Sequence, residues 1–254
     1  MNLEGLLSPG SIGLAIVLVF LMLMLVFAAA GRRQPGVHLR PLAAYQRLTQ
    51  AIGIAVESGR CMHVSLGSGE FNGLQAGSAL VGLGVLERVA RTASISDKPS
   101  IATSGDGTLG ILSQDTIASA FSGIGASGQF DASLGQVAGI TPLSYAAGTV
   151  QIVNSEQVSA TVIAGHIGSE VALIADAAAQ TGGVTLGGSD SLPAQAILVA
   201  AAQEPLLGEE LYAAGAYLNS GAVNAASLRA QDFLRWLLII AMLAGAALKI
   251  LGVL

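Results

Sequence analysis

The residues most suggestive of chemistry are three glycines in the segment CMHVSLGSGEFNG, residues 61–73. Gly67, Gly69 and Gly73 follow an apolar alternating stretch and precede a long apolar run, which is where dinucleotide-binding folds place a glycine-rich turn. In such a turn, the free N–H groups at the start of the following helix hold a pyrophosphate. Asp106, at the end of the next predicted strand, would bind the ribose hydroxyls. These four residues form the candidate cofactor-binding site.

Two features of this segment argue against a nucleotide site. The spacing G-x-G-x-x-x-G is one residue longer than the dinucleotide fingerprint, and Asp106 lies farther from Gly73 than the about 20 residues that the fingerprint expects. Glu70 stands at the first turn of the predicted helix, where its charge would repel an anion. We therefore expect a structural turn between strand and helix and no resident cofactor, with binding of a small ligand as the alternative.

Cysteine and histidine allow two further chemical interpretations. Cys61 and His63 share one face of a predicted strand and could form a nucleophilic pair, but they open the strand instead of following it, so ordinary packing is the expected role. His63 and His166 lack further ligands at the spacing of a metal site. The chain has no G-x-S-x-G, H-E-x-x-H, Walker or C-x-x-C motif. We predict no catalytic and no metal-binding residue; enzymatic activity stays open, and a protein that is not an enzyme is favoured.

Short apolar strands alternate with helices in the middle of the chain. Apolar side chains recur at helical spacing first, and a strand, a glycine turn and a helix follow, twice in succession. This alternation indicates a parallel sheet covered by helices, an α/β fold of the Rossmann-like kind. The predicted elements are helices over 42–56, 74–91 and 109–121 and strands over 62–66 and 99–103.

The second half of this region resembles the first. Residues 64–90 match residues 161–183 in the pattern strand, glycine-rich turn, acidic residue and apolar helix, with Gly67 opposite Gly165. Residues 99–121 match residues 194–217, again as strand, turn and helix. We predict an internal duplication with a first α/β half over 32–122 and a second over 141–228. The small and polar segment 123–140 would be a linker or an insertion between them.

Two long apolar segments predict transmembrane helices at the two ends of the chain. Hydrophobic residues make up 52% of the chain, charged residues 11%, and the mean hydropathy is +0.67. Residues 11–30 carry no charge, and residues 236–254 carry one, Lys249, which can reach the nearer interface. We predict an N-terminal transmembrane anchor over 1–31 and a C-terminal transmembrane helix over 229–254.

The arginines predict the orientation in the membrane. Arg32 and Arg33 follow the first span, and Arg229 and Arg235 precede the second, while the N-terminal segment has only Glu4. By the positive-inside rule, the central region is cytoplasmic, in a multi-pass protein of a bacterial plasma membrane. The alternative is a cleaved signal peptide ending in the small residues of positions 28–30, but its start lacks basic residues and its apolar run is too long.

The charge distribution argues against nucleic acid as a partner. Between Thr92 and Leu228 the one basic residue is Lys98, whereas eleven residues are acidic. Affinity for nucleic acid comes largely from neutralised phosphates, which this region cannot provide.

The overall plan of the chain consists of an apolar N-terminus, the helix RPLAAYQRLTQAI, the turn HVSLGSGEFNGLQAGSAL and an apolar C-terminus. It resembles a family of uncharacterised bacterial membrane proteins that carry a domain of unknown function between two transmembrane helices. The resemblance covers nearly the whole chain. It implies location and architecture, and it assigns no functional residue.

A charge-poor, apolar region of this kind would expose large uncharged patches as a monomer, so we expect a homo-oligomer. The expected function is that of a membrane-anchored structural or scaffold protein whose cytoplasmic α/β module assembles with itself. The alternative is a membrane protein that binds a nucleotide or another small ligand at the turn between Gly67 and Gly73.

Overall fold

The computed structural model describes residues 9–33, 40–71, 73, 75–94, 96, 98–218 and 222–250. Glu4, Leu74 and the last residues of the predicted C-terminal span, 251–254, lie outside the described residues. The chain divides into two units, one formed by Arg40–Leu218 and one by Met1–Leu39 with Asn219–Leu254. The first is called the α/β unit below, and the second the terminal unit.

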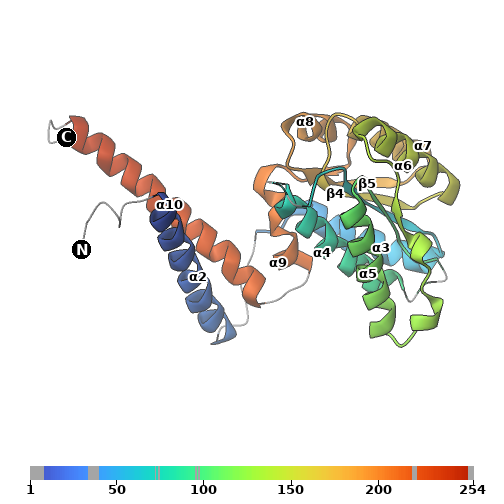
Figure 1. The fold of residues 1–254 in the computed structure, drawn as a ribbon, viewed down its shortest axis with the longest axis horizontal. Helices are drawn as coiled ribbons and strands as arrows, with labels where there is room; N and C mark the ends of the chain where they lie inside the picture. The colour runs from blue at the N-terminus through green and yellow to red at the C-terminus, as the bar shows by residue number, and fades with distance from the viewer. Residues whose placement is uncertain are drawn as a thin grey trace. The chain divides into compact units, whose positions relative to one another are not determined.

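The α/β unit alternates strands with helices, as predicted (Figure 1). Its strands are β1 (Met62–Gly67), β2 (Ile101–Ser104), β3 (Gly135–Val137), β4 (Ala160–His166), β5 (Val184–Ser189) and β6 (Glu204–Pro205). Its helices are α3 (Ala43–Ser58), α4 (Ala76–Ala93), α5 (Gly107–Gly123), α6 (Pro142–Glu156), α7 (Val171–Gln180), α8 (Leu192–Ala201) and α9 (Ala214–Leu218), with 3-10 turns at Ser127–Gln129, Ala132–Leu134 and Gly208–Ala213.

All six strands join one parallel sheet in the order β3-β2-β1-β4-β5-β6. This confirms the predicted α/β class with a parallel sheet. The order is that of doubly wound dinucleotide-binding folds, in which the direction of winding reverses between the first and fourth strands. Ligands of such folds bind at this reversal, outside the carboxyl ends of the strands. In this protein the reversal lies between β1 and β4.

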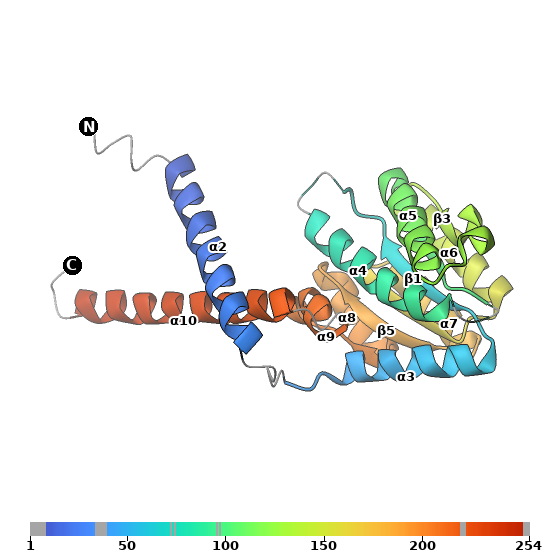
Figure 2. The same ribbon diagram turned by 90° about the horizontal axis from the view of Figure 1, so that it is seen from below.

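Helices cover both faces of the sheet (Figures 1 and 2). Met62, Val64 and Leu66 of β1 point to the face covered by α3, α4 and α5, where one continuous apolar core forms. We call this the first face. The second face is covered by α6, α7 and α8, and its core is divided into two separate apolar clusters. Because successive side chains of a strand point to opposite faces, His63 and Ser65 point to the second face.

Two segments differ from the sequence-based prediction. The start of residues 194–217, predicted as a strand, belongs to helix α8, which has Pro193 in its first turn. The strand lies earlier, in the glycine-containing segment Val184–Ser189. Residues 123–140, predicted as a linker or insertion, contain β3, which pairs with β2 at the edge of the sheet. Both halves have the same order of elements, as doubly wound sheets do, so the duplication stays a prediction.

The glycines of α4 have different surroundings. A Cβ at Gly82 would lie 2.2 Å from the Ala164 carbonyl oxygen, so the helix packs directly on β4 only because this side chain is missing. A Cβ at Gly84 would meet nothing within 4 Å. The absence of a side chain at Gly82 therefore brings α4 onto the sheet of its own chain.

The two ends of the α/β unit are joined by tyrosines. The Tyr217 hydroxyl donates to the Arg40 carbonyl oxygen at 2.6 Å, and its ring stacks on Tyr45 with centroids 4.9 Å apart. The Tyr45 hydroxyl in turn donates to the Glu210 carbonyl oxygen at 2.6 Å. The first and last residues of the α/β unit therefore lie next to each other.

The terminal unit consists of α2 (Pro9–Arg33) and α10 (Ala222–Ile250). Within them, Gly13–Ala30 and Val223–Ile250 are long and apolar enough to span a membrane. Their large apolar side chains are exposed, for example Met22, Trp236 and Met242. Phe27 of α2 and Phe233 of α10 meet edge to face, with ring centroids 6.4 Å apart.

Substituting the two α4 glycines separately tests this packing. Gly82→Ala should lower the free energy of unfolding by about 1–3 kcal/mol, because its Cβ forces the helix away from β4. Gly84→Ala, the matched control, should raise the free energy of unfolding by about 0.5–1 kcal/mol, because alanine is the better helix former and nothing opposes it. Urea unfolding of the full chain in mild detergent measures both; equal effects would contradict the assigned contact.

Candidate functional site

The carboxyl ends of β1, β2, β4 and β5 meet at one edge of the sheet and carry polar residues there. Ser68 follows β1, Asp106 follows β2, His166 ends β4 and Asp190 follows β5. We call this set, together with the first residues of α4 and α7, the edge cluster. It occupies the position at which doubly wound folds bind their ligands.

A histidine and a carboxylate form the centre of the edge cluster. His166 Nδ1 lies 2.6 Å from Asp190 Oδ1, and the Ser78 hydroxyl donates to Asp190 Oδ2 at 2.8 Å. His166 Nε2 lies 3.1 Å from Gln75 Nε2, while Gln75 Oε1 accepts from the Glu70 N–H at 3.1 Å. A neutral imidazole that donates from Nδ1 and accepts at Nε2 satisfies all these contacts.

Gly67 and Gly69, two of the predicted site residues, are glycines because β4 passes close to the end of β1. A Cβ at Gly67, where φ is +82°, would lie 2.0 Å from the His166 carbonyl oxygen, and one at Gly69 would lie 2.5 Å from His166 Cβ. A Cβ at Gly165 would lie 2.0 Å from the Leu66 carbonyl oxygen. Gly67 and Gly165, paired in the predicted duplication, thus lie side by side where β1 and β4 meet, and the chain's own backbone requires both.

The structure brings Asp106 close to Gly67 but not to Gly73. The Gly105 N–H donates to the Gly67 carbonyl oxygen at 2.8 Å, and Asp106 Oδ1 accepts from the Leu109 N–H at 3.0 Å, capping α5. A Cβ at Gly73 would meet only the Glu70 carbonyl oxygen, at 3.9 Å. Gly67, Gly69 and Asp106 therefore lie along the edge and Gly73 stands apart. Cofactor binding by these four residues stays a prediction.

Asp190 is a site residue that the sequence analysis missed. It follows β5 as Asp106 follows β2, and the local sequences SGDG and GSDS are similar. Asp106 caps its helix, whereas Ser191, the N-cap of α8, makes no side-chain capping bond. Asp190 instead binds His166 and Ser78. The similarity of the two turns could have identified it, but its partners on β4 and α4 could not be read from spacing.

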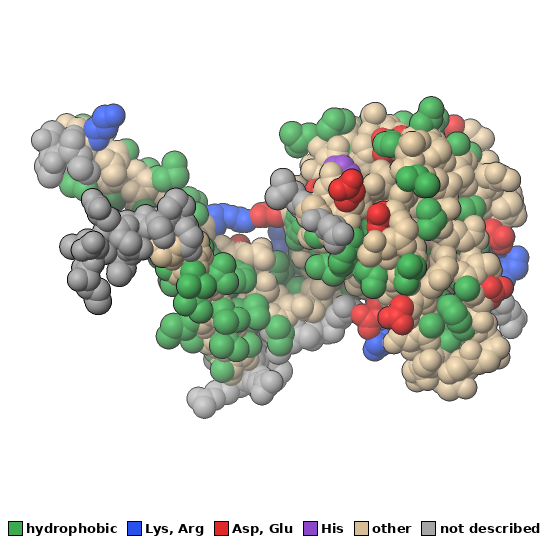
Figure 3. Space-filling view, in the orientation of Figure 1, with side chains coloured by type: hydrophobic (Ala, Val, Ile, Leu, Met, Phe, Trp, Pro, Cys, Tyr) green, Lys and Arg blue, Asp and Glu red, His purple; other side chains and the backbone are tan. Residues whose placement is uncertain are grey.

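The edge cluster is acidic. Glu170 Oε1 accepts from the Gly168 N–H at 2.8 Å and lies 3.4 Å from the Ser68 hydroxyl oxygen. Residues 99–218 contain no Lys or Arg, and Figure 3 shows a histidine beside acidic side chains on a largely uncharged surface. Such surroundings disfavour a phosphate. Among the described residues, no group of three or more His, Cys, Asp or Glu side chains could hold a metal ion.

The arrangement can orient an imidazole, but the contacts of the described residues bring no nucleophile to His166. Asp190 holds His166 as carboxylates hold the histidine of hydrolytic triads. However, His166 Nε2 faces the Gln75 amide, and the Ser78 hydroxyl faces the carboxylate. Covalent catalysis needs a nucleophile within hydrogen-bonding distance of the base. The contacts of His166 therefore hold the imidazole in place between Asp190 and Gln75.

Cys61 and His63 are buried and form hydrogen bonds with different partners. The Cys61 thiol donates to the Pro99 carbonyl oxygen at 3.1 Å, and burial, with the nearby Glu156 charge, raises its pKa to about 12. His63 Nε2 lies 2.8 Å from Thr103 Oγ1, and complete burial lowers the pKa of the imidazole to about 3. At neutral pH these groups are a thiol and a neutral imidazole.

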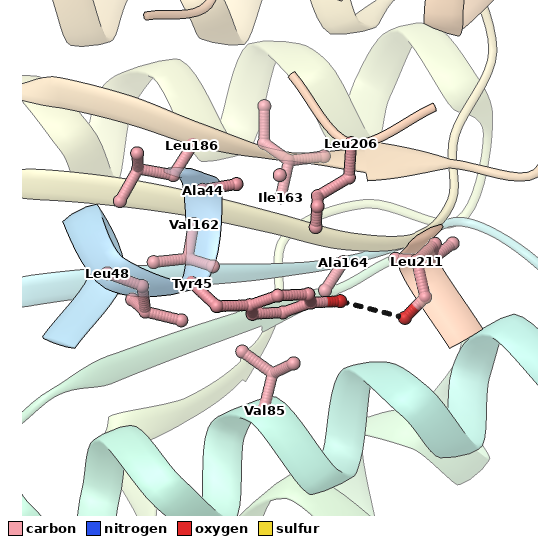
Figure 4. A pocket seen from close by; sticks show the side chains of 11 residues that line it. Ala44, Tyr45, Leu48, Val85, Val162, Ile163, Ala164, Leu186, Leu206 and Leu211 are labelled. Atoms are coloured by element: carbon pink, nitrogen blue, oxygen red, sulfur yellow. Dashed lines mark hydrogen bonds between the residues drawn. The ribbon is translucent and has the colours of Figure 1, made fainter. Parts of the chain in front are cut away.

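Two hollows elsewhere differ from the edge cluster. The cavity of Figure 4 lies between Tyr45 and the sheet, is lined by apolar side chains and measures about 10 Å³, too little for more than one water. A groove of about 440 Å³ runs between α4 and α5 and is open to solvent, with Glu87 and Asp115 on its walls. Neither hollow contains the predicted site residues.

The burial of His63 predicts a pH dependence of stability. The unfolded chain takes up a proton near pH 6.5, whereas the folded chain does so only near 3. The contribution of neutral, buried His63 to the free energy of unfolding is therefore fully present above about pH 6.5. It declines as the pH falls toward 3. When the pH is lowered from about 7.5 to about 5, the free energy of unfolding should fall by about 2 kcal/mol more in the natural chain than in the variant His63→Gln. Urea unfolding at both pH values measures this; parallel losses would show that His63 is not the cause.

A family model described as "Domain of unknown function (DUF6754)" matches residues 10–254. The match includes both helices of the terminal unit and the whole α/β unit. Neither a curated protein nor a solved structure matches the chain. This agrees with the expected membership of an uncharacterised family. The chain belongs to the DUF6754 family, whose domain has no known function.

Proposed function

We propose that the chain is a membrane-anchored scaffold protein whose α/β unit associates with copies of itself. The observation that carries this proposal is an exposed apolar patch formed by Ile111, Val137, Ile140 and Leu143, called the β3 patch below. The chemistry of the edge cluster agrees with it, because the protein's own side chains already occupy the hydrogen-bonding groups there.

The terminal helices support the membrane part of the proposal. Their apolar side chains are exposed over both candidate spans, and a bilayer would cover them. Trp236, 64% exposed, follows Arg235, and tryptophan next to arginine is typical of the membrane interface. With Arg32 and Arg33 at the end of α2, after its candidate span, we place the α/β unit on the cytoplasmic side of a bacterial plasma membrane.

The β3 patch comes from three neighbouring segments that carry no charge. A Cβ at Gly110 would lie 2.5 Å from Val137 Cγ2, so the start of α5, next to Ile111, lies against β3. Ile140 and Leu143 flank Thr141, the N-cap of α6, and are 85% and 69% exposed. Neither 107–114 nor 134–148 contains a charged residue.

A second copy of the chain is the occupant that these properties favour. Residues 40–218 contain 6 Lys or Arg and 14 Asp or Glu, a formal net charge of −8, so two copies repel each other except where charge is absent. An uncharged apolar patch can face the same patch of a second copy. Anchoring in one membrane would also hold copies in the same orientation and raise their effective concentration.

Charging the β3 patch tests this proposal. The natural chain in mild detergent should run as a multiple of 25.4 kDa by mass photometry. Ile140→Asp with Leu143→Asp should weaken association at least about tenfold, because the carboxylates must be desolvated at the contact. Aspartate at position 143 suits the first turn of α6, and position 140 is exposed and precedes the N-cap, so folding should persist.

The matched control is Leu173→Asp with Val199→Asp, two exposed positions on α7 and α8 outside the patch. This variant should associate as the natural chain does. A natural chain that runs as single subunits would refute the proposal, as would equal dissociation of both variants.

A second candidate function is the binding of a nucleotide or another small ligand by Gly67, Gly69, Gly73 and Asp106. It is favoured by the strand order and by the place of Asp106 at the end of β2, next to the reversal of winding. A ligand at the start of α4 would have to displace Gln75 from His166.

Thermal unfolding with and without nucleotides separates the two functions. If the ligand hypothesis holds, a nucleotide present at about 100 times its Kd stabilises the fold by about 2.7 kcal/mol, and Asp106→Asn abolishes this shift while still capping α5. Asp131→Asn is the control, because Asp131 also caps a turn, at Ala132–Leu134, away from the edge cluster. The scaffold proposal expects no nucleotide to raise the Tm.

A further inference from the structure

The second face of the sheet contains a row of buried polar side chains. His63 of β1 pairs in register with Thr161 of β4, and Thr161 pairs with Thr185 of β5. The three residues are completely buried. Because they are register partners on neighbouring parallel strands, their side chains point to the same face. We call them the polar row.

Each member of the polar row has a hydrogen-bonding atom without a protein partner. Among the described residues, nothing bonds His63 Nδ1, Thr161 Oγ1 or Thr185 Oγ1. Buried polar atoms in native proteins nearly always have a partner, from the protein or from ordered water. Three orphan atoms in one row therefore point to partners that are not part of the chain.

The packing of the second face leaves this row between two apolar clusters. Tyr145, Ile163 and Ile174 belong to the cluster at the carboxyl ends of the strands, and Val153 and Val158 to the cluster at the amino ends. The first face, in contrast, has one continuous core. The second of these clusters also contains Ala177 and Ala178 of α7, so the helical side chains there are small.

We propose that two ordered water molecules bind the polar row, one between His63 and Thr161 and one between Thr161 and Thr185. Neighbouring strands lie about 4.8 Å apart, a span that a water with two hydrogen bonds of about 2.8 Å bridges. Water both donates and accepts, so it serves either tautomer of His63 as well as both hydroxyls. A metal ion does not fit, because the row offers one imidazole and no carboxylate or thiolate.

The two waters extend a hydrogen-bonded network that reaches the edge cluster. His63 Nε2 contacts Thr103 Oγ1 at 2.8 Å, and Thr103 Oγ1 lies 3.3 Å from the Tyr145 hydroxyl oxygen. That hydroxyl accepts from the Gly67 N–H at 3.2 Å. With the waters in place, one network runs from Thr185 across the buried face to the turn after β1.

Removing hydroxyls at constant volume tests the proposal by the sign of the change in Tm. Thr161→Val, in the full chain in mild detergent, should lower the Tm by about 2–10 °C, because both waters lose a partner. If the Thr161 hydroxyl had no partner, valine would relieve an unsatisfied buried group and the Tm would rise. An unchanged or raised Tm for Thr161→Val overturns the proposal.

Two comparisons sharpen the test. Thr103→Val, which removes a buried strand hydroxyl with direct protein partners, should lower the Tm in either case and shows that a loss is detectable. Thr185→Val should lower the Tm by less than Thr161→Val, because it touches only one of the two waters. A crystal structure should show density for both waters in the natural chain and lose it in Thr161→Val; a natural structure without this density overturns the proposal.

Discussion

The close approach of β1 and β4 is the constraint on which the rest of the α/β unit depends. Backbone carbonyl oxygens of one strand lie where the other would carry a Cβ, so both strands need glycine at their carboxyl ends, Gly67 and Gly165. This contact lies where the direction of winding reverses, and it places His166 next to Gln75 at the start of α4. Gln75, Ser78 and Asp190 then bind the imidazole. The polar edge is therefore a product of how the two middle strands meet.

The contact between β1 and β4 also affects ligand binding at the position that this fold usually uses for it. In dinucleotide-binding proteins of this strand order, glycines leave space for a pyrophosphate at a helix N-terminus. Here they leave space for the protein's own backbone, and the carboxylate of Asp190 lies at the first turn of α4, held by Ser78. The Asp190 carboxylate therefore occupies the position at the helix start where a phosphate would bind. Strand order alone thus does not identify a function, because function resides in the side chains of the site.

Local patterns predicted the first half of the fold well, because β1, α4, β2 and α5 each carry their own periodicity and turn residues. They failed for α8, since a short apolar run reads equally as a buried strand or a buried helix, and for β3, whose residues Gly135–Val137 show no apolar alternation. The turn after β1 was found at Gly67 and Gly69. The pair of His166 and Asp190 was not, because it joins two strands through their spatial order, which one sequence does not reveal.

The hydrogen bond from Tyr217 to the Arg40 carbonyl has a consequence for folding entropy. Residues 34–221 separate α2 from α10, and closing an unfolded loop of that length to pair the two helices would cost considerable chain entropy. Once the α/β unit has folded, its two ends lie together, because Tyr217 bonds to Arg40. The folded unit therefore acts as a short loop, which makes pairing of the terminal helices a late and nearly local event.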